Sequence, residues 1–295
     1  MRRLMCLLPA SFFITENTMY NFTDMHLHTK FSWDAEQDMM ELAQKAKERG
    51  IRHICVTEHI DFQDGHIKGY QSFDYDGYIS AISRAREIFP FIGAGIEAGE
   101  IHEFKGRFED FIKGKKFDYI IGGLHTIEGD TPVYPEYFKK FANYRDAYMR
   151  YFEEKYKLVS CGGFDAAAHL TIVHRTGAAF YPEFSYASFK NEIDDILKML
   201  IKQSIALEVN ASGLRAKAKN IIPDADVIRA YLSLGGKLIT AGSDGHSLKD
   251  SFEGLETVYE TLSALGVEEV AVYENREPKM VKIMKEKTGA ADEKK

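Results

Sequence analysis

The segment DMHLHTKFSWD, residues 24–34, contains two histidines, His26 and His28, that are separated by one residue. In an extended backbone, residues two apart point to the same side, so this pair would offer two imidazole nitrogens to one metal ion. Asp244 and His246 have the same spacing within ITAGSDGHS, residues 239–247. An isolated His-x-His motif is a pair of surface or core histidines about as often as it is a metal site. Its interpretation therefore depends on the other polar residues of the chain.

Four further polar residues stand at or just after apolar runs of the kind that form buried strands. His59 lies in VTEHIDF, Glu97 in FIGAGIEAGEIHEF, His125 in FDYIIGGLHTIEG and His169 in FDAAAHLTIVHR. A carboxylate in an apolar, glycine-rich run is costly to bury unless it is paired or bound to a metal. The two oxygens of Glu97 could also bridge two cations.

The set of candidate ligands limits the kind of metal. Mixed imidazole and carboxylate ligands without thiolate favour Zn²⁺, Mn²⁺ or Fe²⁺ over Ca²⁺ or an iron–sulfur cluster. Six of the ten histidines belong to the set, whereas His53, His66 and His102 are expected to be structural or solvent-facing and His174 stays open. Nine candidates are too many for one ion and suit two or three: His26, His28, Asp34, His59, Glu97, His125, His169, Asp244 and His246.

Short apolar runs rich in β-forming residues alternate with helical periodicity along most of the chain, which predicts repeated βα units. The predicted strands cover residues 22–26, 53–57, 91–97, 117–122, 164–168, 205–210 and 237–241, with a shorter one at 270–273. The predicted helices include residues 36–49, 144–158, 189–201, 224–234 and 252–265.

Seven or eight such units can form a closed barrel or an open, doubly wound sheet. The candidate ligands, together with Asn210, follow nearly every predicted strand. Residues that converge from most strand ends are typical of a barrel mouth, whereas an open sheet gathers its site at one switch point. The sequence therefore predicts an α/β fold of the barrel type with a metal centre at the carboxyl ends of its strands.

Composition excludes some classes of protein and favours one domain. A chain of 295 residues with 45% hydrophobic and 28% charged residues fits a single large barrel. We expect a disordered extension over residues 1–18, one barrel domain over 19–289 and a solvated tail over 290–295. The alternative for the N-terminus is a secretion signal, because Arg2 and Arg3 precede a short apolar run.

Charge and cysteine content bear on partners and location. The net charge of −7 argues against a nucleic-acid-binding protein, since that task usually needs a basic surface. After the N-terminal segment, no stretch has the roughly 20 consecutive apolar residues that are needed to cross a membrane. Three cysteines without zinc-ribbon or redox spacing favour a reducing cytoplasm. The sequence does not indicate an oligomeric state.

The ordered motifs resemble those of the polymerase-and-histidinol-phosphatase (PHP) family of metal-dependent phosphoesterases. The resemblance runs from about Asp24 to His246 and includes HLH, TEH, GIE, LH, AH and SDGH. Within the family, FDYIIGGLHTIEG, LEVNASGLR, ITAGSDGHS and YENREP look like blocks of the histidinol-phosphate phosphatases. The resemblance implies a distorted (β/α)7 TIM-like barrel with a trinuclear metal site.

Carried over by position, the resemblance implies a distribution of ligands among three metals. Glu97 would bridge the first two ions, and Asp34 would stand where many relatives have a histidine. Aspartate has a shorter side chain and a harder ligand atom than histidine, so the occupancy and identity of the third ion are the least predictable. The first ion would be held by His26, His28, Glu97 and Asp244, the second by Glu97, His125 and His169, and the third by Asp34, His59 and His246.

The activity that the resemblance implies is hydrolysis of L-histidinol phosphate, a small phosphomonoester, in histidine biosynthesis. Glu97, His125 and Asp244 would act through a metal-bound hydroxide. Two arginines, Arg175 and Arg215, are candidates for the substrate phosphate, and Arg215 is favoured because it lies in the NASGLR block. The imidazole and ammonium groups of histidinol phosphate would need an acidic or hydrogen-bonding pocket wall. Glu58, Asp61, Glu100 or Asn210 could supply it.

Three other functions remain open from the sequence. The first is a phosphatase for another small phosphomonoester, because the metal site recognises only the phosphate. The second is a nuclease-like phosphodiesterase, which the net negative charge of the chain disfavours. The third is a catalytically silent metal-binding module that has lost its chemistry through the substitution at Asp34.

Overall fold

The computed structural model describes residues 20–63, 70–182 and 184–284. The predicted extension at residues 1–18, the predicted tail at 290–295 and the expectation for His66 lie outside the described residues. Within the described part of the chain, no helix is both long and apolar enough to span a membrane.

Seven parallel strands form one nearly closed barrel in which each strand pairs with its sequence neighbours. The last strand approaches the first, because the Asp244 amide donates to the His26 carbonyl at 2.8 Å and the His28 amide to the Gly245 carbonyl at 3.0 Å. The predicted barrel is confirmed. Its strands are β1 (Thr23–Leu27), β2 (His53–Ile60), β3 (Ile92–Gly99), β4 (Tyr119–Gly123), β5 (Ala166–Ala167), β6 (Ala206–Asn210) and β7 (Ile239–Gly242).

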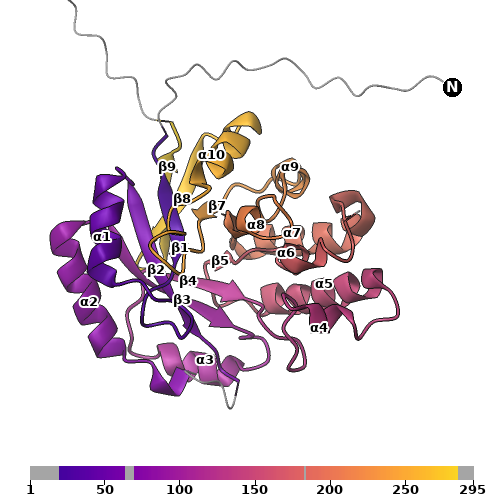
Figure 1. Cartoon of the computed structure of the whole chain (residues 1–295), viewed down its shortest axis with the longest axis horizontal. Helices are drawn as coiled ribbons and strands as arrows, with labels where there is room; N and C mark the ends of the chain where they lie inside the picture. The colour runs from indigo at the N-terminus through magenta and orange to yellow at the C-terminus, as the bar shows by residue number, and fades with distance from the viewer. Residues whose placement is uncertain (1–19, 64–69, 183, 285–295) are drawn as a thin grey trace, which may run out of the picture.

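The helices lie outside these strands, as expected of repeated βα units (Figure 1). Each predicted helix is present, with ends that differ by a few residues. They are α1 (Met39–Glu48), α2 (Tyr75–Ile88), α3 (Lys105–Ile112), α4 (Pro135–Phe138), α5 (Tyr144–Cys161), α6 (Val173–Gly177), α7 (Lys190–Gln203), α8 (Ser212–Arg215), α9 (Ala225–Ser233) and α10 (Leu255–Ala264), with short 3₁₀ turns at Tyr70–Ser72 and Tyr186–Phe189.

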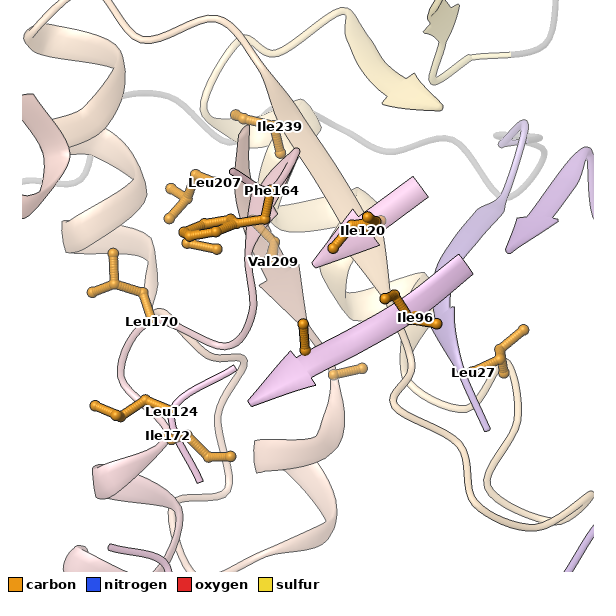
Figure 2. Close-up of a cluster of buried hydrophobic side chains, with 14 of the residues drawn as sticks. Leu27, Ile96, Ile120, Leu124, Phe164, Leu170, Ile172, Leu207, Val209 and Ile239 are labelled. Atoms are coloured by element: carbon orange, nitrogen blue, oxygen red, sulfur yellow. The ribbon is translucent and has the colours of Figure 1, made fainter. Parts of the chain in front are cut away.

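The strands alternate between large aliphatic side chains and small or polar ones. The large side chains join the core that includes residues of α1, α2 and α7, and part of this core is seen in Figure 2, where Ile96, Leu207 and Val209 are labelled. Side chains of successive strand residues point to opposite faces, so the residues between them face the barrel interior. Glu97 on β3 and Glu208 on β6 are therefore inward-facing carboxylates.

The expected eighth strand is present but does not join the barrel. β8 (Glu269–Glu274) pairs in antiparallel fashion with β9 (Glu277–Lys282), which the sequence did not predict. Their two-residue turn has positive φ at Asn275 and Arg276, where glycine is the usual residue of such a turn. The hairpin contacts the amino-terminal side of the barrel, since the Tyr273 hydroxyl donates to the Asp165 carbonyl at 3.2 Å.

Candidate metal centre and active site

Glu97 lies at the centre of the polar cluster at the carboxyl ends of the strands. Its Oε1 is 2.9 Å from His125 Nε2 and 2.8 Å from His169 Nε2. Its Oε2 is 3.1 Å from His26 Nε2 and 3.4 Å from His28 Nε2. Each oxygen thus faces a separate pair of imidazoles, which is the arrangement that a carboxylate bridging two cations requires.

Asp244 lies beside the first of these pairs. Its Oδ1 is 3.6 Å from Nε2 of both His26 and His28. Asp244 and His169 both adopt a positive φ, of 56° and 31°, which is uncommon for residues other than glycine. Such strained backbone is often found where a side chain must point into a functional site.

A second group of donors is more exposed than the Glu97 centre. Asp34 Oδ2 is 3.4 Å from His59 Nε2 and 3.3 Å from His246 Nε2, and the two imidazole nitrogens are 3.4 Å apart. The Asp34 side chain is 27% exposed, against 1% for Glu97. His59 also joins the two groups, because its Nδ1 is 3.3 Å from Glu97 Oε2.

Two glycines leave room for these side chains. A Cβ at Gly123 would lie 2.5 Å from His125 Nε2 and 2.9 Å from Glu97 Oε1. A Cβ at Gly242 would lie 2.5 Å from the Cβ of His26. Any larger residue at either position would displace a candidate ligand.

The electrostatics of the cluster favour ionised carboxylates. Burial alone would raise the pKa of the Glu97 carboxyl, but attraction from His125, His26 and His59 holds this pKa well below its ordinary value. For Asp244, too, the attraction of nearby imidazoles outweighs burial and lowers the pKa. Both side chains therefore present full negative charges to the centre of the site.

Hydrogen bonds behind the cluster determine which imidazole nitrogen faces inward. Nδ1 of His26 is 2.5 Å from Glu208 Oε1, and Nδ1 of His125 is 3.3 Å from Asp61 Oδ1. Because an ionised carboxylate only accepts hydrogen bonds, each Nδ1 carries the proton and each Nε2 directs a lone pair into the cluster. This is how a histidine is prepared for metal ligation.

Glu208 was not among the predicted site residues, although it also accepts a hydrogen bond from the His169 amide at 2.5 Å. It is almost fully buried and interrupts the apolar strand ALEVN. A charge in the middle of a buried strand indicates a specific partner. That signal was available in the sequence, but the partner, His26, is 182 residues away.

The donor set fits divalent metal ions. Nε2 atoms of His26 and His28 lie only 3.0 Å apart. Two facing lone pairs repel each other unless a cation lies between them. Ligands placed about 2.0 to 2.1 Å from a tetrahedral zinc ion are about 3.3 Å from one another, which matches the spacing within the cluster. Three-residue groups with metal-binding spacing include His26, His28 and Asp244 as well as His59, Glu97 and His125.

A cavity of about 300 Å³ opens onto the cluster. Besides seven of the candidate ligands, its lining includes Trp33, Asp61, Tyr134 and Arg175. Arg175 Nη1 is 3.8 Å from Asp244 Oδ2, so its guanidinium is the cation nearest to the carboxylates among the lining residues. The cavity is large enough for a small phosphorylated molecule.

Arg215 lies elsewhere, although the sequence favoured it over Arg175. Its guanidinium donates to the carbonyls of Ser243 at 2.7 Å and Asp244 at 3.1 Å, and it does not line the cavity. In this position it supports the turn that carries Asp244. All four predicted wall residues are buried, and of Glu58, Asp61, Glu100 and Asn210 only Asp61 lines the cavity.

The described histidines that were expected to be structural or solvent-facing, His53 and His102, lie away from the cluster, as does His174, for which no role was predicted. His53 is buried at the start of β2, and His174 Nδ1 is 2.9 Å from the Tyr148 hydroxyl. His102 Nε2 is 2.8 Å from Glu154 Oε1. The other oxygen of Glu154 already accepts from Arg150 and Lys157, so this group is neutralised without a metal ion.

Sequence comparison finds similarity to one family. The model described as PHP domain matches residues 24–212. A probable histidinol-phosphatase from Clostridium acetobutylicum is 30% identical over 77% of this chain and 87% of its own length. A histidinol-phosphatase from Lactococcus lactis is 28% identical over 85% of this chain and 93% of its own length.

Structural comparison finds the same fold in a solved protein. Histidinol phosphate phosphatase from Lactococcus lactis, whose crystal structure contains zinc, L-histidinol and phosphate, superposes with a TM-score of 0.78. The match covers 88% of this chain and 99% of that protein, at 23% sequence identity.

Proposed function

The chain belongs to the PHP domain family, and we propose that it is a metal-dependent phosphatase that hydrolyses L-histidinol phosphate to L-histidinol and phosphate. One observation carries this proposal. Imidazole and carboxylate groups from β2, β3, the ends of β4, β5 and β7 and the segment after β1 converge on a cavity that also contains an arginine. The names of the sequence relatives support the same reaction and the same substrate.

The proposed metal centre would hold two or three divalent ions, of zinc, manganese or iron. Glu97 would hold one ion together with His26, His28 and Asp244, and a second together with His125 and His169. Asp34, His59 and His246 would hold the third. When bound, such ions lower the pKa of a coordinated water and offset negative charge on a phosphate.

The chain's own residues bind and orient the substrate. Arg175 donates to the phosphate oxygens, since a guanidinium can form two parallel hydrogen bonds with them. Its guanidinium is 3.8 Å from Asp244, so a phosphate bound to it would lie next to the metal-ligand candidates. Arg215 contributes by holding the Ser243 and Asp244 carbonyls, and any direct contact with phosphate would require it to leave them.

Asp61 is the best-placed residue for the alcohol part of the substrate. It lines the cavity, and it keeps the proton on Nδ1 of His125. A carboxylate in the wall would attract the ammonium or imidazolium group of histidinol. Trp33, which is 41% exposed at the same cavity, offers an aromatic face to a cation or a ring.

Phosphate release from L-histidinol phosphate tests the proposal. The protein is stripped of metal, reconstituted separately with Mn²⁺, Zn²⁺ and Fe²⁺, and assayed beside p-nitrophenyl phosphate at equal concentration. We expect selective turnover of L-histidinol phosphate with at least one metal. Equal, weak turnover of both esters would reject the substrate, and stoichiometric metal binding without any turnover would indicate a silent metal-binding module. The reducing cytoplasm remains the predicted location.

A further inference from the structure

Glu58 is a fully buried carboxylate directly before His59, and it is not a metal-ligand candidate. Its oxygens accept from the Thr29 amide at 3.1 and 3.2 Å and from the Thr29 hydroxyl. Its Oε2 also accepts from the Ser32 hydroxyl at 2.5 Å. Glu58 therefore connects the end of β2 with the segment that follows β1 and carries His28 and Asp34.

Ser32 connects this carboxylate to two candidate ligands. Besides Glu58, its Oγ is 2.9 Å from the His59 amide nitrogen and 3.2 Å from His28 Nδ1. The hydroxyl has one proton to donate and two lone pairs with which to accept. The His59 amide can only donate, so it uses one lone pair. The proton must then go either to Glu58 or to His28.

The distances decide between these two partners. A hydroxyl–carboxylate contact of 2.5 Å is that of a strong, charge-assisted hydrogen bond, so the Ser32 proton points to Glu58. The remaining lone pair of Ser32 then accepts from His28 Nδ1. With its proton on Nδ1, His28 has a free lone pair on Nε2, which is the atom that faces Glu97 and His26.

We infer that Glu58 is a positioning residue that, through Ser32, sets the tautomer of His28 and fixes the backbone of His59 for metal binding. This inference rests on the metal centre of the proposed function. It assigns to Glu58 a role other than that of a substrate-pocket wall. It also explains why a charge is buried at this point, where it contacts hydroxyl and amide donors from one short segment.

The Glu58→Gln variant reverses the direction of the hydrogen bonds. An amide oxygen can still accept from Thr29, but the amide NH₂ would donate to Ser32. Both lone pairs of Ser32 would then be occupied, and its proton would turn to His28 Nδ1. His28 would carry its own proton on Nε2 and could not ligate. Loss of such an outer contact typically weakens metal affinity about 10- to 100-fold.

The experiment reads metal affinity and histidine tautomer rather than turnover. Protein with ¹⁵N-labelled histidine is prepared with Zn²⁺ bound, and the His28 signals are assigned by comparison with His28→Gln. At pH 8 we expect His28 of the wild type to carry its proton on Nδ1 and the metal on Nε2. In Glu58→Gln we expect the Nε2–H tautomer at His28 and no metal-bound nitrogen there. Titration with Zn²⁺ against a chelator should show a 10- to 100-fold loss of affinity in Glu58→Gln and in Ser32→Ala.

Two matched variants separate positioning from a general effect of changing a buried polar group. Glu154→Gln alters a buried carboxylate of α5, and Ser212→Ala removes a buried hydroxyl at the start of α8. Both should keep wild-type zinc affinity within about threefold. An unchanged His28 tautomer in Glu58→Gln, or an equal loss of affinity in the matched variants, would overturn the inference. Since no readout uses substrate, a failure of the proposed reaction would be recognised separately.

Discussion

Glu97 brings together imidazoles from four strands. His26 and His28 belong to β1 and its end, His59 to β2, and His125 and His169 follow β4 and β5. Their nitrogens lie between 2.8 and 3.4 Å from the two oxygens of this one carboxylate. A substitution at Glu97 should therefore affect more than one metal ion.

For Glu97→Gln we expect phosphatase activity to fall by at least about 100-fold, because removing a charge that orders the reacting groups has effects of this size. Metal content should fall as well, since an amide nitrogen does not ligate. Steady-state kinetics and elemental analysis of the purified variant provide the measurement. Full activity with unchanged metal content would contradict the bridging role.

The two arginines should differ in how their loss affects kinetics. Arg175→Ala removes a guanidinium from the cavity, so KM for the phosphate ester should rise and kcat/KM should fall about 10- to 100-fold. Arg215→Ala removes donors to the Ser243 and Asp244 carbonyls, so we expect a lower melting temperature and weaker metal binding. Inhibition by inorganic phosphate distinguishes them. If Arg175→Ala retained wild-type phosphate affinity while Arg215→Ala lost it, the assignment would be reversed.

The strands and the candidate ligands at their ends were predictable because each inward-facing polar residue interrupts a local apolar run. The β8–β9 hairpin was not predictable in this way. Its turn, Asn275-Arg276, has an arginine where glycine would signal a hairpin, and β9 is a mostly exposed strand that contains Pro278. Local periodicity therefore showed the barrel but not the hairpin at its amino-terminal side.

The supporting hydrogen bonds of the site were not predictable from spacing. Glu208 contacts His26 across the barrel, and Glu58 contacts Ser32 across the β1–β2 boundary. Both pairs depend on which strands become neighbours. The same holds for Arg175 and Arg215, which follow site-bearing strands at similar intervals. Only the fold shows that Arg175 enters the cavity and that Arg215 binds backbone carbonyls.

A buried lysine of α5 links that helix to the end of β5. Lys155 Nζ donates to the Ala168 carbonyl at 2.8 Å. Burial lowers the pKa of Lys155 to about 8, although Glu97, Glu208 and Glu100 attract its charge. Between pH 8 and 10.5 the unfolded chain holds this proton while the folded chain releases it. The contribution of Lys155 to the free energy of unfolding therefore increases as the pH rises through that window.

We expect the free energy of unfolding of the wild type to increase relative to that of Lys155→Met by about 2 kcal/mol between pH 7.5 and pH 10. Urea unfolding of both proteins at the two pH values provides the measurement, and the difference between them cancels tyrosine ionisation that both share. A difference that stays constant with pH would mean that Lys155 keeps an ordinary pKa in the folded protein.

The metal centre joins strand ends around the whole barrel mouth. Its candidate ligands come from the carboxyl ends of β1 to β5 and β7, so bound ions would link segments from residue 26 to residue 246. The barrel also has an extensive apolar core between strands and helices. Unlike a zinc finger, which needs metal to fold, the protein should remain folded without its ions but should unfold more easily.

Removal of the metal with a chelator should lower the melting temperature by about 5 to 10 °C. Free metal at 100 times its dissociation constant stabilises a folded protein by about 2.7 kcal/mol, and each kcal/mol shifts the melting temperature of a chain of this size by about 2 to 4 °C. Calorimetry with and without chelator, followed by return of Zn²⁺ or Mn²⁺, measures the shift and its reversal. Glu97→Gln should show little change on chelation. If the wild-type protein lost its metal and kept its melting temperature, the ions would bind the folded and the unfolded chain equally well. That result would contradict a preformed metal centre at the barrel mouth.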